Sequence, residues 1–422
     1  MLKTVKKVAL VCHSDLLGGA AVVTYRLMDA LRAEGIDARM VVFNKVSDSE
    51  NVYVAGSGRQ RKAAFLAERL RIFTHNGFSR KDLFKVSIAN TGLPLWRHPW
   101  ILEADVVNLN WINQGLLSLD GIRKIAALGK PIVWTMHDMW CMTGVCHHAH
   151  SCTRFEGDCG KCYQLNSHRN RDLSFSTHIK KQALYAQVPI HFVAVSNWLA
   201  GRCRESSLMR DADLRVIPNA FPVETFATEV EGETPELAPL VGKRLIIMGA
   251  ARLDDPIKGF DSAIEALNLF CEKHPKVAEN VGVVFFGVLR DPSLLNSLKM
   301  PYLHLGRIES PALLRRVYAA GIVVLSTSKY ETLPGTLIEG QAAGCVPVTF
   351  GNGGQADIVD HMQNGYIARG GDVADLVEGL HWAFETPLRR DVLHQNVERR
   401  FSASVVARRY IEVYQCVLSG RE

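Results

Sequence analysis

The amino-acid sequence predicts an α/β protein built from two doubly wound, Rossmann-like domains. Short apolar runs alternate with amphipathic helical patterns, which is typical of parallel sheets covered by helices. This alternation occurs twice, before and after an acidic, proline-containing stretch at residues 227–241 that reads as a linker. The 422 residues are enough for two domains. Doubly wound sheets bind ligands at the carboxyl ends of their strands, so we expect a cleft between the domains to hold the active site.

The first series spans residues 1–225 and forms the predicted N-terminal domain. A helical pattern at residues 20–34 follows the first apolar run and ends at Gly35. The apolar runs that predict strands are residues 8–12, 38–43, 105–109, 131–136 and 191–195, with a short one at 214–219.

The second series spans residues 226–402 and forms the predicted C-terminal domain. The predicted strands are residues 244–249, 281–286, 302–305, 321–326 and 346–350. The predicted helices are residues 260–272, 311–320 and 374–385. A last helical pattern at 405–418 lies in a C-terminal segment, residues 403–422.

The composition is that of an ordinary globular protein, with 47% hydrophobic and 22% charged residues. No run of 18 apolar residues predicts a transmembrane helix. The apolar part of the N-terminus is too short for a signal peptide, and Asp15 follows too soon. We therefore expect a cytoplasmic protein whose ten cysteines are reduced.

The net charge of +6 is unevenly distributed along the chain. Residues 1–225 contain 29 Lys and Arg against 19 Asp and Glu, whereas the remainder contains 20 against 24. A basic first half predicts an anionic partner, such as a phosphorylated acceptor or a membrane surface. Within it, residues 59–73 mix basic and apolar side chains. This pattern fits an interfacial helix, but it fits better a core-packed helix with a solvated basic face.

The most informative stretch runs from Glu331 to Glu339, where a predicted strand passes into a short helix. Pro334 and Gly335 lie where the helix would begin, and the free N–H groups of a helix start favour an anion. Glu339 lies about one turn inside the helix, placed to accept hydrogen bonds from a hydroxylated ring. Taken alone, two acids near a helix start fit a capped surface helix better than a site.

Other strand-end loops carry polar residues. Arg252 and Lys258 follow a strand and suit a diphosphate, because arginine offers a bidentate fork and lysine a point charge. Gly18-Gly19 follows the first strand and permits close approach of an anion or a sugar, although a full dinucleotide fingerprint is absent. His137-Asp138 closes another strand and fits a substrate-orienting histidine and a structural hydrogen bond equally well. The glycine-rich loop at residues 350–355 fits a ligand contact or a simple turn.

A cysteine-rich loop at residues 141–162 also contains three histidines, His147, His148 and His150. In a reducing compartment this spacing favours a structural zinc site over disulfides or free thiols, and over a catalytic zinc, which needs an open position. The predicted ligands are Cys146, Cys152, Cys159 and Cys162, with a histidine as the substitute for one cysteine.

In this order, these motifs resemble those of the retaining glycosyltransferases of family 4, which have the GT-B fold. The resemblance covers nearly the whole chain and extends to Gly344 and Pro347 after the second glutamate. The segments that carry it are Glu331–Glu339, Arg252 with Lys258-Gly259, Gly18-Gly19, Trp134–Asp138, Ala194–Ser196 and Ile217–Asn219. The cysteine cluster is similar to that of a subgroup associated with bacterial capsule or exopolysaccharide synthesis.

The resemblance implies a role for each site residue. Arg252 and Lys258 would neutralise the donor diphosphate, and Glu339 would hold the ribose hydroxyls. Glu331 and the amides of Gly335, Thr336 and Leu337 would contact the donor sugar and phosphate. His137 would face the donor sugar, Gly18 and Gly19 would contact phosphate and acceptor, and the loop Gly306-Arg307-Ile308 would receive the base.

The resemblance also implies a metal-independent reaction, a UDP- or GDP-sugar donor and a glycan or polyprenyl-diphosphate-linked acceptor, without nucleic acid. The acceptor suggests peripheral contact at the inner membrane face. The helix at residues 405–418 would return to the N-terminal domain. Two features depart from the family pattern: the loop before Lys258 is one residue longer, and Leu333-Pro334 replaces the commoner Phe-Gly. The alternatives are a nucleotide-sugar epimerase, a phosphorylase or a non-catalytic nucleotide-sugar-binding protein.

Overall fold

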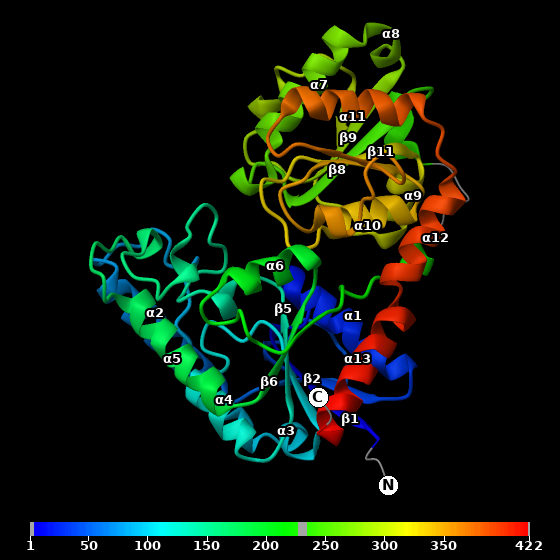
Figure 1. The fold of residues 1–422 in the computed structure, drawn as a ribbon. Helices are drawn as coiled ribbons and strands as arrows, with labels where there is room; N and C mark the ends of the chain where they lie inside the picture. Colours follow the sequence, from blue (N-terminus) through cyan, green and yellow to red (C-terminus); the bar gives the residue numbers. More distant parts are fainter. Residues whose placement is uncertain (1–3, 227–233, 421–422) are drawn as a thin grey trace. The chain divides into compact units, whose positions relative to one another are not determined.

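The computed structural model describes residues 4–226 and 234–420 (Figure 1). The chain divides into two compact units: unit 1 comprises Met1–Ala220 and Ala403–Glu422, and unit 2 comprises Phe221–Ser402. Each unit contains one sheet whose strands all pair in parallel. This confirms the predicted fold class.

Unit 1 has a seven-stranded sheet in the order β3-β2-β1-β4-β5-β6-β7. The strands are β1 (Lys7–Ser14), β2 (Asp37–Asn44), β3 (Val52–Val54), β4 (Val106–Leu109), β5 (Ile132–Met136), β6 (Ile190–Ala194) and β7 (Leu214–Val216). The helices are α1 (Gly19–Ala33), α2 (Gly58–His75), α3 (Pro99–Glu103), α4 (Leu119–Ala126), α5 (Leu173–Gln187), α6 (Asn197–Glu205) and α13 (Ala403–Ser419). The short edge strand β3 was not predicted from the sequence.

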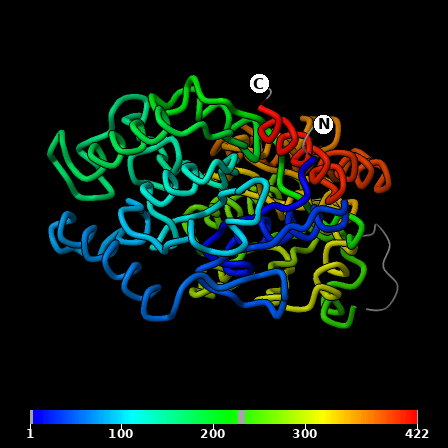
Figure 2. The backbone as a smooth tube through the Cα atoms, turned by 90° about the horizontal axis from the view of Figure 1, so that it is seen from below, coloured from blue at the N-terminus to red at the C-terminus, as the bar shows by residue number. Residues whose placement is uncertain are grey.

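The last helix, α13, packs on unit 1 although it follows unit 2 in the sequence. Its buried residues Val406, Ala407, Tyr410 and Tyr414 recur at one-turn spacing and join the core formed by α1, β1 and β2. Both tyrosine hydroxyls are hydrogen-bonded, because that of Tyr414 lies 2.6 Å from Asn108 Nδ2 and that of Tyr410 lies 3.1 Å from Thr135 Oγ1. In Figure 2 this red helix lies beside the blue N-terminal segment.

Unit 2 has a six-stranded sheet in the order β10-β9-β8-β11-β12-β13. The strands are β8 (Arg244–Arg252), β9 (Val281–Val288), β10 (Tyr302–His304), β11 (Gly321–Ser326), β12 (Val346–Phe350) and β13 (Tyr366–Ala368). The helices are α7 (Phe260–Lys273), α8 (Pro275–Ala278), α9 (Pro311–Ala319), α10 (Gly335–Ala342), α11 (Val373–Glu385) and α12 (Arg390–Phe401). Apolar residues of both faces of the strands are fully buried, as in a sheet covered on both sides.

Part of the predicted linker, residues 227–233, lies outside the described residues. In the remaining part, Pro235–Leu240 forms a 3₁₀ helix with Leu237 and Leu240 buried. None of the helices within residues 4–226 and 234–420 has the length and apolar character needed to cross a membrane.

Candidate active site

The two sheets each have one point where the strand order reverses. In unit 2 it lies between β8 and β11, and in unit 1 between β1 and β4. Connections leave the sheet in opposite directions at such a point, and the crevice that opens at the carboxyl ends of the strands is where this kind of sheet binds ligands. Most of the predicted site residues of both units follow strands at or next to these points, whereas Gly306-Arg307-Ile308 follow the edge strand β10.

Arg252 is the last residue of β8. Its guanidinium lies 3.4 Å from an Asp254 oxygen and 3.0 Å from an Asp255 oxygen, and its side chain is 33% exposed. These two acids are part of the lengthened loop, so the insertion supplies partners that hold the guanidinium in place. The guanidinium remains accessible to an anionic ligand.

Lys258 is held by a loop that is joined to the segment after β11. Gly259, which follows it, has φ of 64°, and a Cβ there would lie 2.2 Å from the Thr327 carbonyl oxygen. The Thr327 hydroxyl donates to the carbonyls of Lys258 (3.0 Å) and Gly259 (2.8 Å). Only glycine allows this approach, which brings the ends of β8 and β11 together.

Glu331 forms an ion pair with Lys258. Lys258 Nζ lies 2.5 Å from Glu331 Oε1, and the two side chains are 29% and 18% exposed. The backbone of Glu331 is fixed by the glycine-rich loop after β12, because Gly354 N–H donates to the Glu331 carbonyl at 2.9 Å. A Cβ on Gly353 would lie 2.1 Å from that carbonyl, so this loop supports Glu331 through close backbone packing.

Helix α10 begins beside this pair. Its N-cap residue is Pro334, and no side chain caps the helix. Gly335 and Thr336 in its first turn are partly exposed, whereas Leu337 is buried. A helix start of this kind presents N–H groups and the positive end of the helix dipole, which suits a phosphate.

Glu339 lies one turn further along α10 and is half-buried. Burial and then the neighbouring Glu339 carboxylate raise the pKa of Tyr318, in α9, well above its usual value. Glu339 is therefore placed next to a fully buried hydroxyl, whose role the sequence did not suggest. The predicted base-binding loop Gly306-Arg307-Ile308 follows β10 at the same sheet edge, where the Gly306 carbonyl accepts from Gly287 N–H at 2.7 Å.

In unit 1 a cavity of about 360 Å³ brings the predicted residues of that unit together. Gly18, Gly19, His137 and Asp138 all line it. Gly18 has φ of 94° and directly precedes α1, so the turn from β1 into this helix depends on glycine. Sequence reasoning missed His13 and Trp111, which also line the cavity. It named His148, a further lining residue, only as part of the cysteine-rich loop.

His137 is held as a neutral imidazole. Its Nε2 lies 2.9 Å from Asn110 Oδ1, and because this oxygen only accepts, Nε2 carries the hydrogen. Burial lowers the pKa of His137 to about 4, against an opposing effect of Asp138. The side chain is thus an uncharged hydrogen-bonding group at neutral pH.

Asp138 is the centre of a hydrogen-bond network. Its Oδ2 accepts from Trp111 Nε1 (2.8 Å) and lies 2.7 Å from His147 Nδ1, and its Oδ1 accepts from Trp140 N–H (2.8 Å). Burial raises the pKa of Asp138, but His147 and the backbone donor outweigh burial and lower it to about 2. The other nitrogen of His147 lies 3.1 Å from Ser87 Oγ. Both nitrogens of His147 are engaged, which makes it a support for Asp138 and Trp111.

The four predicted zinc ligands lie in one loop region. After burial, the neighbouring Cys162, Cys159 and Cys152 raise the pKa of Cys146, to about 12. Cys159 Sγ accepts from Gly144 N–H at 3.3 Å. Nevertheless, no group of three or more His, Cys, Asp or Glu side chains in the described part of the chain is placed to hold a metal ion. The sulfurs would have to approach one another further to form a tetrahedral site.

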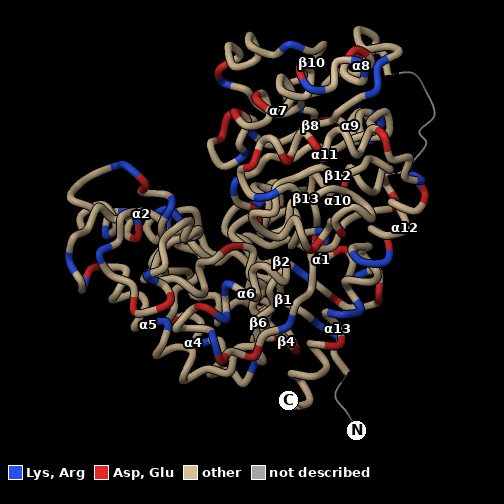
Figure 3. The backbone as a smooth tube through the Cα atoms, turned by 45° about the horizontal axis from the view of Figure 1, so that its top comes forward, with Lys and Arg blue, Asp and Glu red and all other residues tan. Residues whose placement is uncertain are grey.

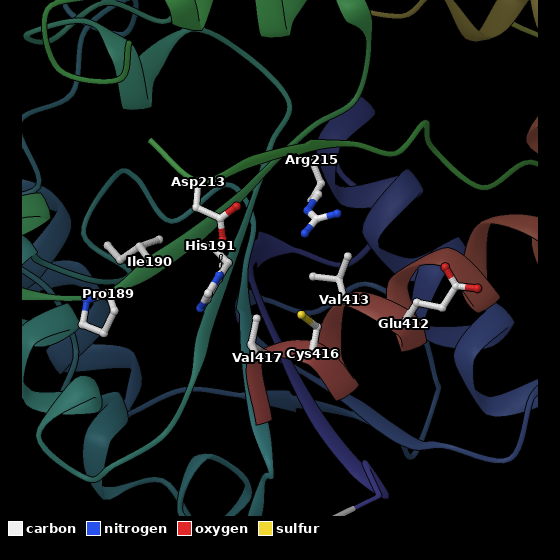
Figure 4. Close-up of a pocket in the computed structure, with 9 residues that line it drawn as sticks. All are labelled: Pro189, Ile190, His191, Asp213, Arg215, Glu412, Val413, Cys416 and Val417. Carbon is white, nitrogen blue, oxygen red and sulfur yellow. Dashed lines mark hydrogen bonds and ion pairs between the residues drawn. The ribbon is translucent and has the colours of Figure 1, made fainter. Parts of the chain in front are cut away.

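A larger cavity of about 470 Å³ contains none of the predicted residues (Figure 4). It lies where β6 and β7 begin, between residues 412–417 of α13 and three residues at the strand starts: His191 of β6, Arg215 of β7, and Asp213, which directly precedes β7. The carboxyl ends of the strands, which carry the candidate site, are at the opposite edge of the same parallel sheet. Size alone therefore does not identify the site in this fold.

The two halves of the chain match models of two glycosyltransferase families. Residues 17–225 match the model described as Glycosyltransferase Family 4, and residues 236–400 match the one described as Glycosyl transferases group 1. None of the curated proteins compared with the chain matches it.

Solved structures share the fold over nearly the full length. HepE from Anabaena in complex with UDP is 14% identical with a TM-score of 0.63, over 96% of this chain and 99% of that chain. Sucrose-phosphate synthase from Thermosynechococcus elongatus is 14% identical with a TM-score of 0.64, over 98% and 100%. A UDP-forming α,α-trehalose-phosphate synthase from Burkholderia xenovorans is 15% identical with a TM-score of 0.64, over 97% and 100%. The two family matches and the shared fold identify the chain as a glycosyltransferase of the GT4 type with the GT-B fold.

Proposed function

We propose that this enzyme is a retaining hexosyltransferase that uses a nucleoside diphosphate sugar and extends a glycan or polyprenyl-diphosphate-linked acceptor in surface polysaccharide synthesis. The observation that carries the donor assignment is the convergence of Arg252, Lys258 and Glu331 beside the uncapped start of α10. Structures with the same fold, those of Anabaena HepE, contain UDP and UDP-glucose, which supports a UDP-sugar as the donor.

The cations and the helix start act on the leaving diphosphate. As the bond between the anomeric carbon and the phosphate oxygen breaks, negative charge grows on the diphosphate. Arg252, Lys258 and the first N–H groups of α10 stabilise this charge, because they are positioned before the reaction begins. Their contribution is larger in the transition state than in the bound substrate, and that difference accelerates the transfer.

The ion pair between Lys258 and Glu331 suggests how donor binding prepares the site. An incoming phosphate replaces the carboxylate as the partner of Lys258 Nζ. The Glu331 oxygen, now 2.5 Å from that nitrogen, is then released to accept a hydrogen bond from a sugar hydroxyl. Glu339, deeper in α10, takes the ribose hydroxyls.

Retention follows from attack on the same face of the sugar. The acceptor oxygen forms its bond to the anomeric carbon on the side from which the phosphate leaves, and the acceptor proton passes to the leaving phosphate oxygen. No side chain is assigned as a nucleophile. The acceptor is assigned to the cavity of unit 1, where Gly18 and Gly19 permit close approach and neutral His137 offers a hydrogen-bonding group to a sugar.

The test begins with thermal shifts in the presence of UDP-, GDP- and ADP-sugars, of which we expect UDP-sugars to stabilise the protein. The stabilising donor is then incubated with glycan acceptors, and the anomeric configuration of the product is read by NMR. We expect a retained configuration. Epimerisation or phosphorolysis of the donor without transfer, or an inverted product, would contradict the proposal.

We further propose that the cysteine cluster takes up a structural zinc ion. Four thiols in one loop and the N–H group directed at Cys159 Sγ support this, because such donors stabilise thiolates. The ligands would be Cys146, Cys152, Cys159 and Cys162, drawn together on binding, and the zinc would stabilise the loop without taking part in transfer.

A further inference from the structure

The outer face of α2 exposes large apolar side chains in unit 1. Leu66 and Leu70 are 51% and 62% exposed, and they lie on the same side of the helix because they are four residues apart. Two phenylalanines of the loop that follows are also exposed, Phe78 by 69% and Phe84 by 60%. Phe78 contacts Phe73 near the end of α2, with ring centroids 5.6 Å apart, and Phe84 stacks on Phe65 at 6.3 Å. We call Leu66, Leu70, Phe78 and Phe84 the α2 surface.

The inner face of α2 carries a buried ion pair whose two members are hydrogen-bonded to backbone groups outside the helix. Glu68 Oε2 lies 3.1 Å from an Arg69 nitrogen, and both side chains are at most 5% exposed. Glu68 Oε1 accepts from the N–H groups of Ile88 (2.8 Å) and Ala89 (2.9 Å), and Arg69 donates to two backbone carbonyls. If the helix rolled to bury its leucines, both ions would lose these backbone hydrogen bonds, which is costly for buried charges. The exposure of the α2 surface is therefore built into the fold.

The same segment is strongly basic. Residues 59–85 contain eight Lys and Arg but only two acids, and Lys and Arg positions recur along α2 in Figure 3. Both acids are already matched within the segment, Glu68 by Arg69 and Asp82 by Lys85. Six cations remain around the α2 surface: Arg59, Arg61, Lys62, Arg71, Arg80 and Lys81.

We infer that the α2 surface docks on the surface of an anionic phospholipid bilayer. Apolar side chains flanked by Lys and Arg are the pattern of a segment that inserts into the acyl boundary while its cations contact the headgroups. A second copy of this chain is disfavoured as the occupant, because two equal basic surfaces repel each other. The segment lies at the edge of unit 1 in Figures 1 and 2. Such docking would hold the enzyme where a lipid-linked acceptor is found.

The test is flotation of the full chain with vesicles of phosphatidylcholine, alone or mixed with phosphatidylglycerol. We expect binding only to the anionic vesicles, weakened by at least tenfold when the salt is raised from 0.1 to about 0.5 M. L66Q/L70Q should weaken binding by about tenfold or more, as glutamine keeps the helix but not the apolar contact. R80Q/K81Q should also weaken it by about tenfold.

The matched control is L102Q/L128Q, which changes two other exposed leucines of unit 1, 46% and 38% exposed. It should bind vesicles like the wild type. All variants should keep the thermal shift with UDP, so that a failure of docking is distinguished from a failure of the donor site. The inference is overturned if the wild type ignores anionic vesicles, binds neutral ones equally, or binds as well with L66Q/L70Q as without it.

Discussion

In each unit the candidate site lies at the carboxyl ends of the strands of that unit's own sheet. The two sites differ in how their side chains are charged and paired. In unit 2, Arg252, Lys258 and Glu331 are charged, partly exposed and paired with nearby charges. In unit 1, His137 is neutral and held by an amide, and its neighbour Asp138 is an ion whose oxygens are occupied by an indole, an imidazole and a backbone donor. The partly exposed ion pairs of unit 2 can be replaced by contacts with an anionic ligand, whereas the buried hydrogen bonds around Asp138 in unit 1 hold its side chains in place.

This difference separates two kinds of work. A site that must bind a diphosphate and stabilise it as it leaves needs mobile charges that accept a new anion. A site that orients a sugar needs fixed, uncharged hydrogen-bonding groups. We therefore expect substitutions in unit 2 to act through charge and nucleotide binding, and substitutions in unit 1 to act through orientation and through pH.

The largest effect is expected for Arg252→Ala. Removing the guanidinium takes away stabilisation of the leaving diphosphate, and loss of one such group lowers kcat by about a hundredfold or more. Because the side chain is 33% exposed, the fold should be retained. Initial transfer rates at saturating donor measure the effect.

The control for Arg252→Ala is Arg389→Ala, which removes a 76% exposed arginine paired with Asp391 in the same unit. It should leave the rate unchanged. Near-normal transfer by Arg252→Ala would remove Arg252 from the mechanism, and with it the proposed contrast between the units.

A smaller effect is expected for Glu339→Ala, which should weaken UDP binding by about tenfold, as two charge-assisted hydrogen bonds to ribose are lost. Binding is measured by titration calorimetry. His137→Ala is the comparison in unit 1 and should change the UDP affinity by less than about twofold, because a neutral histidine assigned to the sugar contributes little to UDP binding.

If Glu339→Ala left the UDP affinity unchanged, the ribose assignment would be wrong. If His137→Ala lost as much affinity as Glu339→Ala, the nucleotide would not belong to unit 2 alone. Either result would contradict the assignment of the nucleotide to unit 2 and of a sugar to unit 1.

The fold was predictable because buried parallel strands appear in the sequence as continuous apolar runs. Both series of strands were therefore found, in their order along the chain. The two short edge strands, Val52–Val54 and Tyr366–Ala368, escaped prediction. Three residues give little periodicity, although the equally short strands Leu214–Val216 and Tyr302–His304 were found. Strand-end positions likewise predicted where Arg252, Lys258 and Glu331 would lie.

The sequence did not predict which side chains would pair. Asp138 and His147 are nine positions apart in the sequence, and Ser87 and His147 are sixty apart. Contacts of this kind depend on how the loops fold back onto the sheet. The histidines of the cysteine-rich loop were considered as metal ligands, yet His147 forms a hydrogen bond with Asp138. Asn110 and Trp111 directly follow a predicted strand, and that position was the available signal for their role.

The pH dependence of stability should reveal the buried histidines. Burial lowers the pKa of both His13 and His137 from 6.5 to about 4. Between these values the unfolded chain binds protons that the folded chain does not, so the free energy of unfolding falls as the pH falls from 6.5 to 4. The loss should be about 3 kcal/mol per histidine. Urea unfolding at several pH values measures it.

His137→Gln should flatten this dependence, because glutamine keeps a hydrogen bond to Asn110 without titrating. The exposed His75→Gln is the matched control and should not change the slope. A slope unaffected by His137→Gln would mean that the pKa of His137 is the same in the folded and the unfolded chain, which would contradict its burial as a neutral group.

The smallest effect on catalysis is expected from removal of zinc. Protein purified under reducing conditions without chelator should contain about one zinc per chain, which elemental analysis counts. Chelation should lower the Tm by several degrees, since a structural zinc contributes folding energy. The UDP affinity should stay within about twofold, because we assign the nucleotide to unit 2, whereas the cysteines belong to unit 1.

The quadruple change of Cys146, Cys152, Cys159 and Cys162 to serine should abolish zinc binding, whereas Cys271→Ser, in unit 2, should leave it intact. An absence of zinc from wild-type protein would contradict the zinc proposal and show that packing alone stabilises the loop. A loss of UDP binding on chelation would instead couple the two units and contradict their separation by function.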